Sequence, residues 1–192
     1  MPTMKTVTSF SQMLEQVEPT SANYQLFLER SLQGLLTRDE NPQSHICVYF
    51  LPYDRETKHV FIVHHKKSGL WISPGGHVDK NETLLEALNR EIHEELGIQN
   101  FFVHAPLPFL LTTTPIENNV QPCKMHYDIW HLLPTDGKNF SVDPSEFHAT
   151  RWMSISDAEK IVTDPPNLLA LNTLKMNGDT YAEHFLSRCR RS

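Results

Sequence analysis

The sequence predicts one mixed α/β domain preceded by a helical segment. Apolar residues recur at helical spacing before residue 38, short runs of β-forming residues begin at residue 45, and a helix with clear ends lies among those runs. At 192 residues the chain is long enough for one well-buried core and too short for two large ones. We therefore expect an N-terminal helical segment over residues 1–44 and a main domain over residues 45–192.

Two helices are expected between Ser9 and Thr37, on either side of a break at Pro19. Their apolar residues recur three or four positions apart, as they do on one face of a helix. These residues are Phe10, Met13, Leu14 and Val17, then Leu26, Phe27, Leu32, Leu35 and Leu36. The polar residues 38–44 then separate these helices from the main domain.

Segments rich in β-branched and aromatic residues predict the strands of the main domain. They are His45 to Leu51, Val60 to His64, Leu70 to Ser73, Phe101 to Thr114, Lys124 to Leu133 and Phe147 to Met153. Helical spacing returns at Ser156 to Thr163 and at Leu168 to Leu186, where Asn177-Gly178 predicts a break.

The most clearly bounded element is a helix from about Leu84 to Leu96. Thr83 and Glu86 have the spacing of a capping box, and Gly97 suits a left-handed C-terminal turn. An apolar stripe on this helix is expected to pack on the sheet. It consists of Leu85, Leu88, Ile92 and Leu96.

The adjacent arc of this helix carries Glu91, Glu94 and Glu95. Residues at i, i+3 and i+4 meet on one helix face, so these carboxylates repel each other by about 0.2–0.5 kcal/mol per exposed pair. A divalent cation between them removes that repulsion, and oxygen ligands favour Mg²⁺ or Mn²⁺. Taken alone, such a cluster is more often a solvated helix face.

The turn before the helix favours the metal-binding interpretation. Its sequence is Ser73-Pro74-Gly75-Gly76-His77. Paired glycines allow backbone carbonyls and amides to approach a ligand closely. Together with the carboxylate helix, this turn is expected to form one wall of a site.

The stretch from Gly76 to Ile98 resembles a complete Nudix box, Gx5Ex7REUxEExGU with U apolar. Its fixed residues are Gly76, Glu82, Arg90, Glu91, Glu94, Glu95 and Gly97. Seven fixed positions, each requiring one residue type with a background frequency of about 5–7%, give a chance match on the order of one in a billion, so the resemblance is specific.

The resemblance implies an α/β/α sandwich with a curved mixed sheet. It implies that Glu91, Glu94 and Glu95 hold Mg²⁺, or Mn²⁺ as a substitute, and that the backbone carbonyl of Gly75 is a further ligand. Glu82 and Arg90 correspond to the pair that braces the loop against the helix, a role that a charge-assisted bond also makes physically plausible.

The implied reaction is hydrolysis of a diphosphate linkage in a nucleotide or other nucleoside-diphosphate-type small molecule, by attack of metal-activated water at phosphorus. Glu91, Glu94 and Glu95 are the predicted catalytic residues. Glu95 is our choice of general base within the box. Glu117 and Glu146 are candidates outside it, although ordinary loop glutamates are the more common alternative.

A basic run and a later histidine extend the resemblance. Some bacterial family members contain "HHKK-G-W-PGGH" followed by "H-x-D", and this chain contains His64-His65-Lys66-Lys67, His77 and His126-Tyr127-Asp128. His64 and Lys66 are candidate substrate-binding residues because cations at a strand end can meet a phosphate, although a solvated turn is about as common. The resemblance adds His77, His126 and Asp128 as candidates. The eleven histidines show no HxxxH or HExxH spacing, so they predict no nitrogen-ligand metal site.

Composition excludes several other functions. A formal charge of −6 and a pI near 6.0 disfavour long nucleic acids as partners. The first twenty residues lack the apolar run of a secretory signal, and no apolar stretch is long enough to span a membrane, so a cytoplasmic location is expected. The spacing of Cys47, Cys123 and Cys189 indicates neither disulfides nor a zinc knuckle.

Two alternatives to a diphosphohydrolase share its fold. An isopentenyl-diphosphate isomerase-like enzyme uses the same fold, but the cysteine motif of that family is not found here. A Nudix-fold sensor or regulator binds a nucleotide without hydrolysing it, and such modules often have degraded boxes, whereas this box is intact. The sequence is also compatible with a homodimer.

Overall fold

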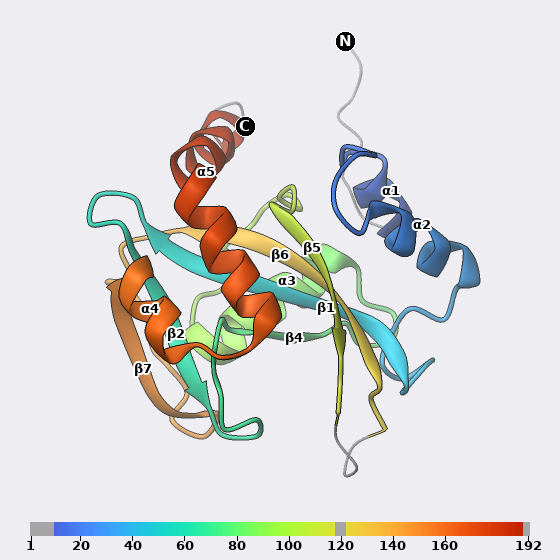
Figure 1. Cartoon of the computed structure of the whole chain (residues 1–192), viewed down its shortest axis with the longest axis horizontal. Helices are drawn as coiled ribbons and strands as arrows, with labels where there is room; N and C mark the ends of the chain where they lie inside the picture. Colours follow the sequence, from blue (N-terminus) through green and yellow to red (C-terminus); the bar gives the residue numbers. More distant parts are fainter. Residues whose placement is uncertain (1–9, 118–121, 190–192) are drawn as a thin grey trace.

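The computed structural model describes residues 10–117 and 122–189, with side chains up to residue 183 (Figure 1). Its helices are α1 (Phe10–Leu14), α2 (Tyr24–Gln33), α3 (Leu84–Leu96), α4 (Ile155–Ile161) and α5 (Pro165–Cys189). Its strands are β1 (Ser44–Asp54), β2 (His59–His65), β3 (Trp71–Ile72), β4 (Gly75–His77), β5 (Leu110–Pro115), β6 (Met125–Pro134) and β7 (Phe147–Ser154).

The strands in the described part of the chain form one mixed sheet in the order β3-β2-β1-β6-β5. In addition, β4 pairs with β1 and β7 pairs with β2. The central pair, β1 and β6, is parallel, and the other pairs are antiparallel. β1 is buried along most of its length, as expected for a strand covered on both faces.

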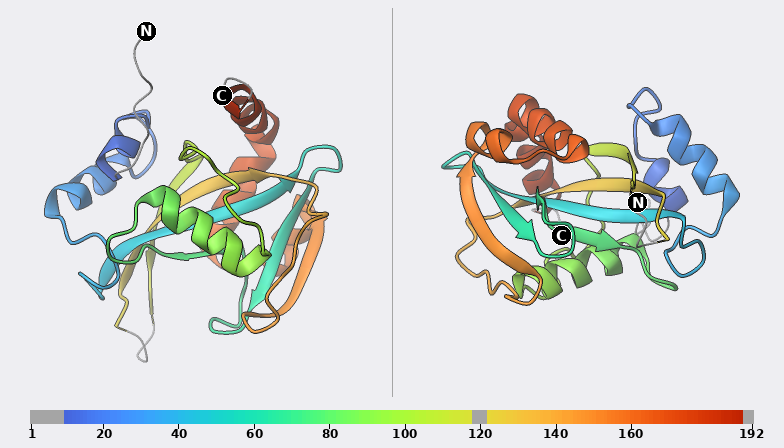
Figure 2. Two further views of the ribbon diagram at one scale, coloured as in Figure 1. Left: turned by 180° about the vertical axis from the view of Figure 1, so that it is seen from behind. Right: turned by 60° about the horizontal axis from the view of Figure 1, so that its bottom comes forward.

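The sheet lies between two helical layers, with α3 on one face and α4 and α5 on the other (Figure 2). Side chains alternate between the faces along each strand. On β1, Ile46, Val48 and Phe50 pack in one core with the apolar residues of α3. Leu51 and Tyr53 face the other way and pack in a second core with residues of α4 and α5. This alternation decides which face each polar side chain of β1, β4 and β6 can occupy.

The N-terminal helices join the main core. Phe10 from α1 and Phe27 from α2 belong to the same apolar cluster as the buried residues of α3. Arg30 is also buried, and its guanidinium donates to the carbonyls of Gly34 at 2.8 Å and Ser44 at 2.7 Å. These bonds tie the end of α2 to the start of β1. The domain boundary at residue 45 stays a prediction.

Three sequence predictions were wrong in detail. Residues 101–109 form no strand before β5, because Pro106 and Pro108 cannot donate ladder hydrogen bonds. α5 continues through Asn177-Gly178, where Gly178 lies close to Leu174 and Tyr53. The Gly75–His77 turn also contains the short strand β4. Of the helices that the structure describes, none combines the length and apolarity needed to cross a bilayer.

Candidate functional site

Helix α3 presents the predicted carboxylates, and its ends are fixed as the sequence indicated. The Glu86 backbone amide donates to Thr83 Oγ1 at 3.2 Å, and the Thr83 amide donates to the Glu86 carboxylate at 2.8 Å. Gly97 ends the helix in the left-handed conformation, with φ of 72°. The helix phase places Leu88 and Ile92 in the core. Glu91 and Glu95, on the adjacent arc, are buried as well.

Arg90 joins α3 to the loop between β4 and α3. Its Nε donates to Glu82 Oε1 at 2.7 Å, and its Nη2 donates to Glu82 Oε2 at 2.9 Å. Nη2 also donates to the His77 carbonyl at 2.8 Å, while Nη1 contacts Glu91 at 2.7 Å and Glu94 at 3.2 Å. The predicted pairing of Glu82 with Arg90 is therefore present. It connects the end of β4 with the face of α3 that carries the glutamates.

The three glutamates differ in their burial. Glu95 is 5% exposed and Glu91 is 8% exposed, whereas the side chain of Glu94 is 55% exposed. Burial raises the pKa of Glu91 to about 7, although Arg90 opposes this effect. Burial, together with the nearby Glu91 carboxylate, also raises the pKa of Glu95 well above its usual value. Two adjacent carboxyl groups are thus held where ionisation is unfavourable unless further positive charge is present.

The two glycines of β4 allow close packing, Gly76 against a glutamate of α3 and Gly75 against β1. A methyl group at Gly76 would lie 2.3 Å from Glu91 Oε1, so only glycine permits this close approach. Gly75 has φ of 141°, and a methyl group there would lie 2.3 Å from the carbonyl oxygen of Val48. The Gly75 backbone amide also donates a hydrogen bond to Glu95. The glycine pair and the glutamates therefore form one compact group.

This group fits a hard divalent cation. Glu95 Oε2 is buried and has no hydrogen-bond partner in the described structure. The nearby side-chain donors are carboxylate oxygens, which suit Mg²⁺ and Mn²⁺. A cation beside Glu91 and Glu95 would favour their ionised forms and relieve their mutual repulsion.

The candidate bases outside the box occupy different positions. Glu146 lies close enough to Glu95 to contribute to the raised pKa of that residue, and its carboxylate is 3.0 Å from Lys67 Nζ. Glu117 is exposed and lies two residues after the end of β5, immediately before the undescribed residues 118–121. Electrostatic proximity therefore favours Glu146 over Glu117.

The predicted substrate-binding residues fall into two groups. His64 and Lys66 lie at the end of β2, where His64 stacks on Trp71 with ring centroids 5.1 Å apart and Lys66 Nζ donates to the Pro144 carbonyl at 2.6 Å. The other three, His77, His126 and Asp128, lie on β4 and β6. The structure therefore does not gather all five residues in one place.

His77, His126 and Asp128 share the sheet face opposite α3. His77 pairs with Cys47, and Asp128 also pairs with Cys47, so their side chains point away from the face of Ile46 and Val48. Gly76, the residue before His77, points toward Glu91 instead. The carboxylates beside Gly76 and the group formed by His77, His126 and Asp128 therefore lie on opposite faces of the sheet.

Asp128 is almost fully buried within that second group. Thr112 Oγ1 donates to its Oδ2 at 3.1 Å, Thr114 Oγ1 bonds to the same oxygen, and Trp130 Nε1 donates to Thr112 at 2.8 Å. Burial raises the pKa of Asp128 to about 7, and its Oδ1 is buried without a partner in the described structure.

His45 and Cys123 lie beside His77 and His126, an arrangement that was not predicted from the sequence. One possible ligand atom from each of these four residues lies within 4.8 Å of the others. The residues come from distant parts of the chain and match no short metal-binding motif. Only the register of β1 against β4 and β6, which spacing alone does not reveal, could have identified them. Cys47 and Cys123 are buried free thiols, while the side chain of Cys189 lies outside the described residues.

Comparison with protein families gives a direct match. The NUDIX domain model matches residues 43–171. Nudix hydrolase 6 of Arabidopsis thaliana is 30% identical over 138 residues, which are 68% of this chain and 45% of that protein. The m7GpppN-mRNA hydrolase NUDT17 of Homo sapiens is 29% identical over 115 residues, 52% of this chain and 35% of that protein. The chain therefore spans less than half the length of these curated relatives.

Solved structures show the same fold. The E. coli dihydroneopterin triphosphate pyrophosphohydrolase has a TM-score of 0.57 at 18% identity, covering 69% of this chain and 95% of that chain. The MutT NUDIX hydrolase from Burkholderia pseudomallei has a TM-score of 0.54 at 21% identity, covering 69% and 98%. The predicted architecture, a mixed sheet with helices on both faces preceded by helices, is confirmed.

Proposed function

Since the chain belongs to the NUDIX domain family, we propose that it is a Mg²⁺-dependent hydrolase that cleaves a diphosphate linkage in a nucleotide or other nucleoside-diphosphate-type small molecule. The observation that carries this proposal is the burial of Glu91 and Glu95 beside each other, with Glu94 on the same helix face. Buried carboxylates of like charge need a cation to be ionised together. An ordinary solvated helix face does not bury them.

Glu91, Glu94, Glu95 and the backbone carbonyl of Gly75 are the proposed ligands of Mg²⁺, with Mn²⁺ as a substitute. The bound cation would neutralise phosphate charge and make water more acidic. Arg90 would keep Glu91 and Glu94 oriented through its Nη1 contacts, and Glu82 would hold Arg90 in place.

Glu95 is the proposed general base. Its Oε2 is the carboxylate oxygen without a hydrogen-bond partner, so in the ionised form it can accept a proton from the water that attacks phosphorus. The amide of Gly75 would hold the carboxylate in position. Glu146 is the alternative base, because it is near Glu95 and reaches the site from outside the box.

The substrate is proposed at the level of its chemical class. The relatives are named for different compounds, m7GpppN-mRNA in one case and dihydroneopterin triphosphate in another, which share linked phosphates. His64 and Lys66 are proposed to meet the substrate from the end of β2. We propose a small-molecule partner, because the net charge of −6 disfavours long nucleic acids. The cytoplasmic location expected from the sequence stays a proposal.

A panel of nucleoside triphosphates, nucleotide sugars, dinucleotides and non-nucleotide diphosphates tests the proposal. Release of phosphate, pyrophosphate or nucleoside monophosphate is measured with Mg²⁺ or Mn²⁺, and again after exhaustive chelation. We expect cleavage of at least one class only with added metal, with a rate that rises toward alkaline pH because the water and the base act when deprotonated. Full activity without metal would exclude the mechanism.

The same panel separates an enzyme from a sensor. Binding of each compound is measured in parallel with turnover. Tight binding of one compound without turnover of any would favour a Nudix-fold regulator. No described feature favours that alternative, because the carboxylates of the box are all present.

A further inference from the structure

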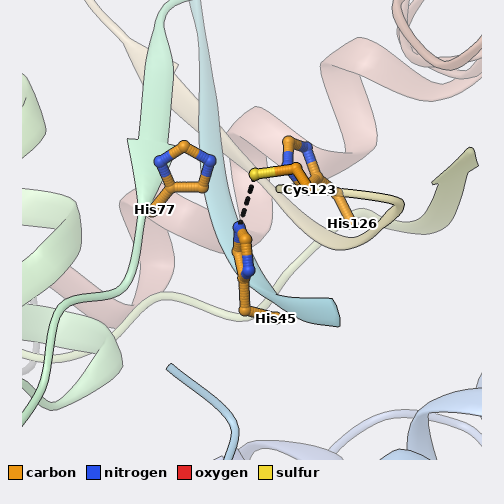
Figure 3. A group of neighbouring side chains, drawn as sticks. All are labelled: His45, His77, Cys123 and His126. Atoms are coloured by element: carbon orange, nitrogen blue, oxygen red, sulfur yellow. Dashed lines mark hydrogen bonds between the residues drawn. The ribbon is translucent and has the colours of Figure 1, made fainter. Parts of the chain in front are cut away.

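Four metal-ligating side chains meet on the sheet face opposite the Nudix glutamates. Figure 3 shows His45 from β1, His77 from β4 and His126 from β6 around Cys123, which lies just before β6. Strand register brings the three histidines together. His45 pairs with His126, and Cys47, which is two residues after His45 on the same face of β1, pairs with His77. The three imidazole centroids are 4.7, 4.9 and 5.0 Å apart.

The spacing of the ligand atoms is close to that of a tetrahedral site. Zinc bonds of about 2.0–2.1 Å to nitrogen and about 2.3 Å to sulfur place neighbouring ligand atoms about 3.3–3.6 Å apart. Cys123 Sγ is 3.7 Å from His45 Nε2, close to that value. All four ligand atoms lie within 4.8 Å of one another, so closure needs movements of about 1 Å, within the range of side-chain torsions.

The hydrogen bonds around the imidazoles leave nitrogens available for a ligand. His45 Nδ1 lies 3.0 Å from the Asn41 carbonyl, so it carries the proton, and Nε2 presents its lone pair toward Cys123. A partner on the second ring nitrogen is the usual support of a metal-bound histidine. His126 Nε2 is buried without a hydrogen-bond partner in the described structure, which a metal bond would remedy.

The imidazoles are also in the form that binds metal. Burial lowers the pKa of His77 to about 3 and of His126 to about 4, and it lowers the pKa of His45 as well. All three rings are therefore neutral at physiological pH, and neutral imidazole is the ligating form.

We propose that His45, His77, Cys123 and His126 form a structural Zn²⁺ site, distinct from the Nudix carboxylates. Three nitrogens and one sulfur match the preference of zinc and not that of Mg²⁺. Four protein ligands complete a tetrahedral shell and leave no open position for catalysis. Zinc with one thiolate retains one positive charge, and the buried Asp128 carboxylate lies close enough to a nitrogen of His126 to compensate it.

The site would hold β4 in place. Its ligand His77 directly follows Gly76, which contacts Glu91, and the His77 carbonyl accepts a hydrogen bond from Arg90. A zinc ion bound to His77 would thus fix β4. The opposite face of β4 contacts the carboxylates through Gly76. This role does not depend on the reaction proposed above.

Metal content and cobalt substitution test the proposal, with the two buried cysteines as a matched pair. Full-length protein in a Cys189→Ser background, which leaves only two thiols, is purified without chelator and analysed by mass spectrometry for metals. We expect about one zinc per chain, lost in Cys123→Ser and retained in Cys47→Ser. Glu94→Gln should also retain zinc, because Glu94 belongs to the separate box.

Co²⁺ added to the chelated protein should produce a thiolate-to-cobalt charge-transfer band and intense visible bands of a tetrahedral centre. Cys47→Ser should keep the charge-transfer band, and Cys123→Ser should lose it. Absence of the band in folded wild-type protein, checked by circular dichroism, would overturn the proposal. So would loss of the band in folded Cys47→Ser, since Cys47, His126 and Asp128 form the competing ligand group. Because the wild-type spectrum and Cys47→Ser suffice for this decision, a misfolded Cys123→Ser protein would not prevent it.

Discussion

Arg90 donates two parallel hydrogen bonds to the Glu82 carboxylate, from Nε at 2.7 Å and from Nη2 at 2.9 Å. The same guanidinium contacts Glu91 and Glu94, so Arg90→Ala should release three carboxylates at once. We expect a loss of about 1–3 kcal/mol in unfolding free energy and a clear fall in Mg²⁺-dependent turnover. Arg90→Lys should recover only part of both, because an ammonium cannot make the paired bonds. Denaturant unfolding and steady-state kinetics measure the two effects.

Arg38→Ala is the control for the loss of an arginine charge. Arg38 makes a surface bond of 2.8 Å to Asp79, and both side chains are more than a third exposed. Such pairs contribute about 0–1 kcal/mol. Turnover of Arg38→Ala should be normal. Wild-type melting and turnover in Arg90→Ala would show that the brace has no such role.

Glu95→Gln tests the proposed base. In the metal-free protein, burial and the nearby Glu91 carboxylate raise the pKa of Glu95 and so disfavour its ionised form, and the neutral amide of similar shape should leave the melting temperature unchanged or slightly higher. Metal binding should weaken, and turnover at saturating Mg²⁺ should fall by about 10²-fold or more. Calorimetric Mn²⁺ titration and kinetics provide the measurements. Near-normal turnover, or an unfolded protein, would instead make Glu95 structural.

Glu86→Gln is the matched control on the same helix. Glu86 accepts hydrogen bonds from the Thr83 amide and hydroxyl, and glutamine also suits this position of a capping box. The variant removes the same charge as Glu95→Gln without touching the buried carboxylates. Its turnover should stay within a few fold of wild type.

Gly76→Ala should disturb the metal group through sterics alone. Gly76 does not have the left-handed backbone that excludes alanine, but a methyl group would lie 2.3 Å from Glu91 Oε1. Glu91 must then move, and we expect about tenfold weaker Mn²⁺ binding with a parallel loss of turnover. Gly178→Ala is the control, because its nearest neighbour is the flexible end of Leu174. Unchanged Mn²⁺ affinity in Gly76→Ala would disprove the close packing.

The buried His131 should make the free energy of unfolding decrease as the pH falls. Burial lowers its pKa in the folded protein to about 4, below the value of 6.5 expected in the unfolded chain. Between pH 6.5 and 4 the unfolded chain therefore binds more protons, so the contribution of His131 is complete above pH 6.5 and is lost as pH falls toward 4. His131→Leu should flatten this dependence by up to about 1.4 kcal/mol per pH unit. Denaturant unfolding from pH 4 to 8 measures it, and equal slopes in both proteins would contradict the assignment.

Local signals made the carboxylate group predictable. The capping box at Thr83, the glycine after Leu96 and the spacing of the glutamates are all set within one helix, so the sequence determines their relative positions. The pairing of Glu82 with Arg90, eight positions apart, was expected from the resemblance to the Nudix box and is present in the structure.

The histidine-cysteine cluster was not predictable because it depends on register between distant strands. A one-residue slip of β6 against β1 would move His126 to the other sheet face, away from His45. The pattern of apolar residues shows that these segments are strands but not how they align. The short β4 was missed for a related reason, since a Gly-Gly pair has little β propensity and forms a strand here only by pairing with β1.

The parallel pairing of β1 with β6 has a consequence for how the chain folds. Paired residues such as Ser44 and Met125 are 81 positions apart, and these two strands form the centre of the sheet. Closing so long a loop before its contacts form slows folding. During synthesis, the edge of β1 that pairs with β6 stays unpaired until β6 has been made. A nascent chain that ends after α3 should therefore be sensitive to proteases, and resistance should arise only once residues beyond Pro134 have left the ribosome.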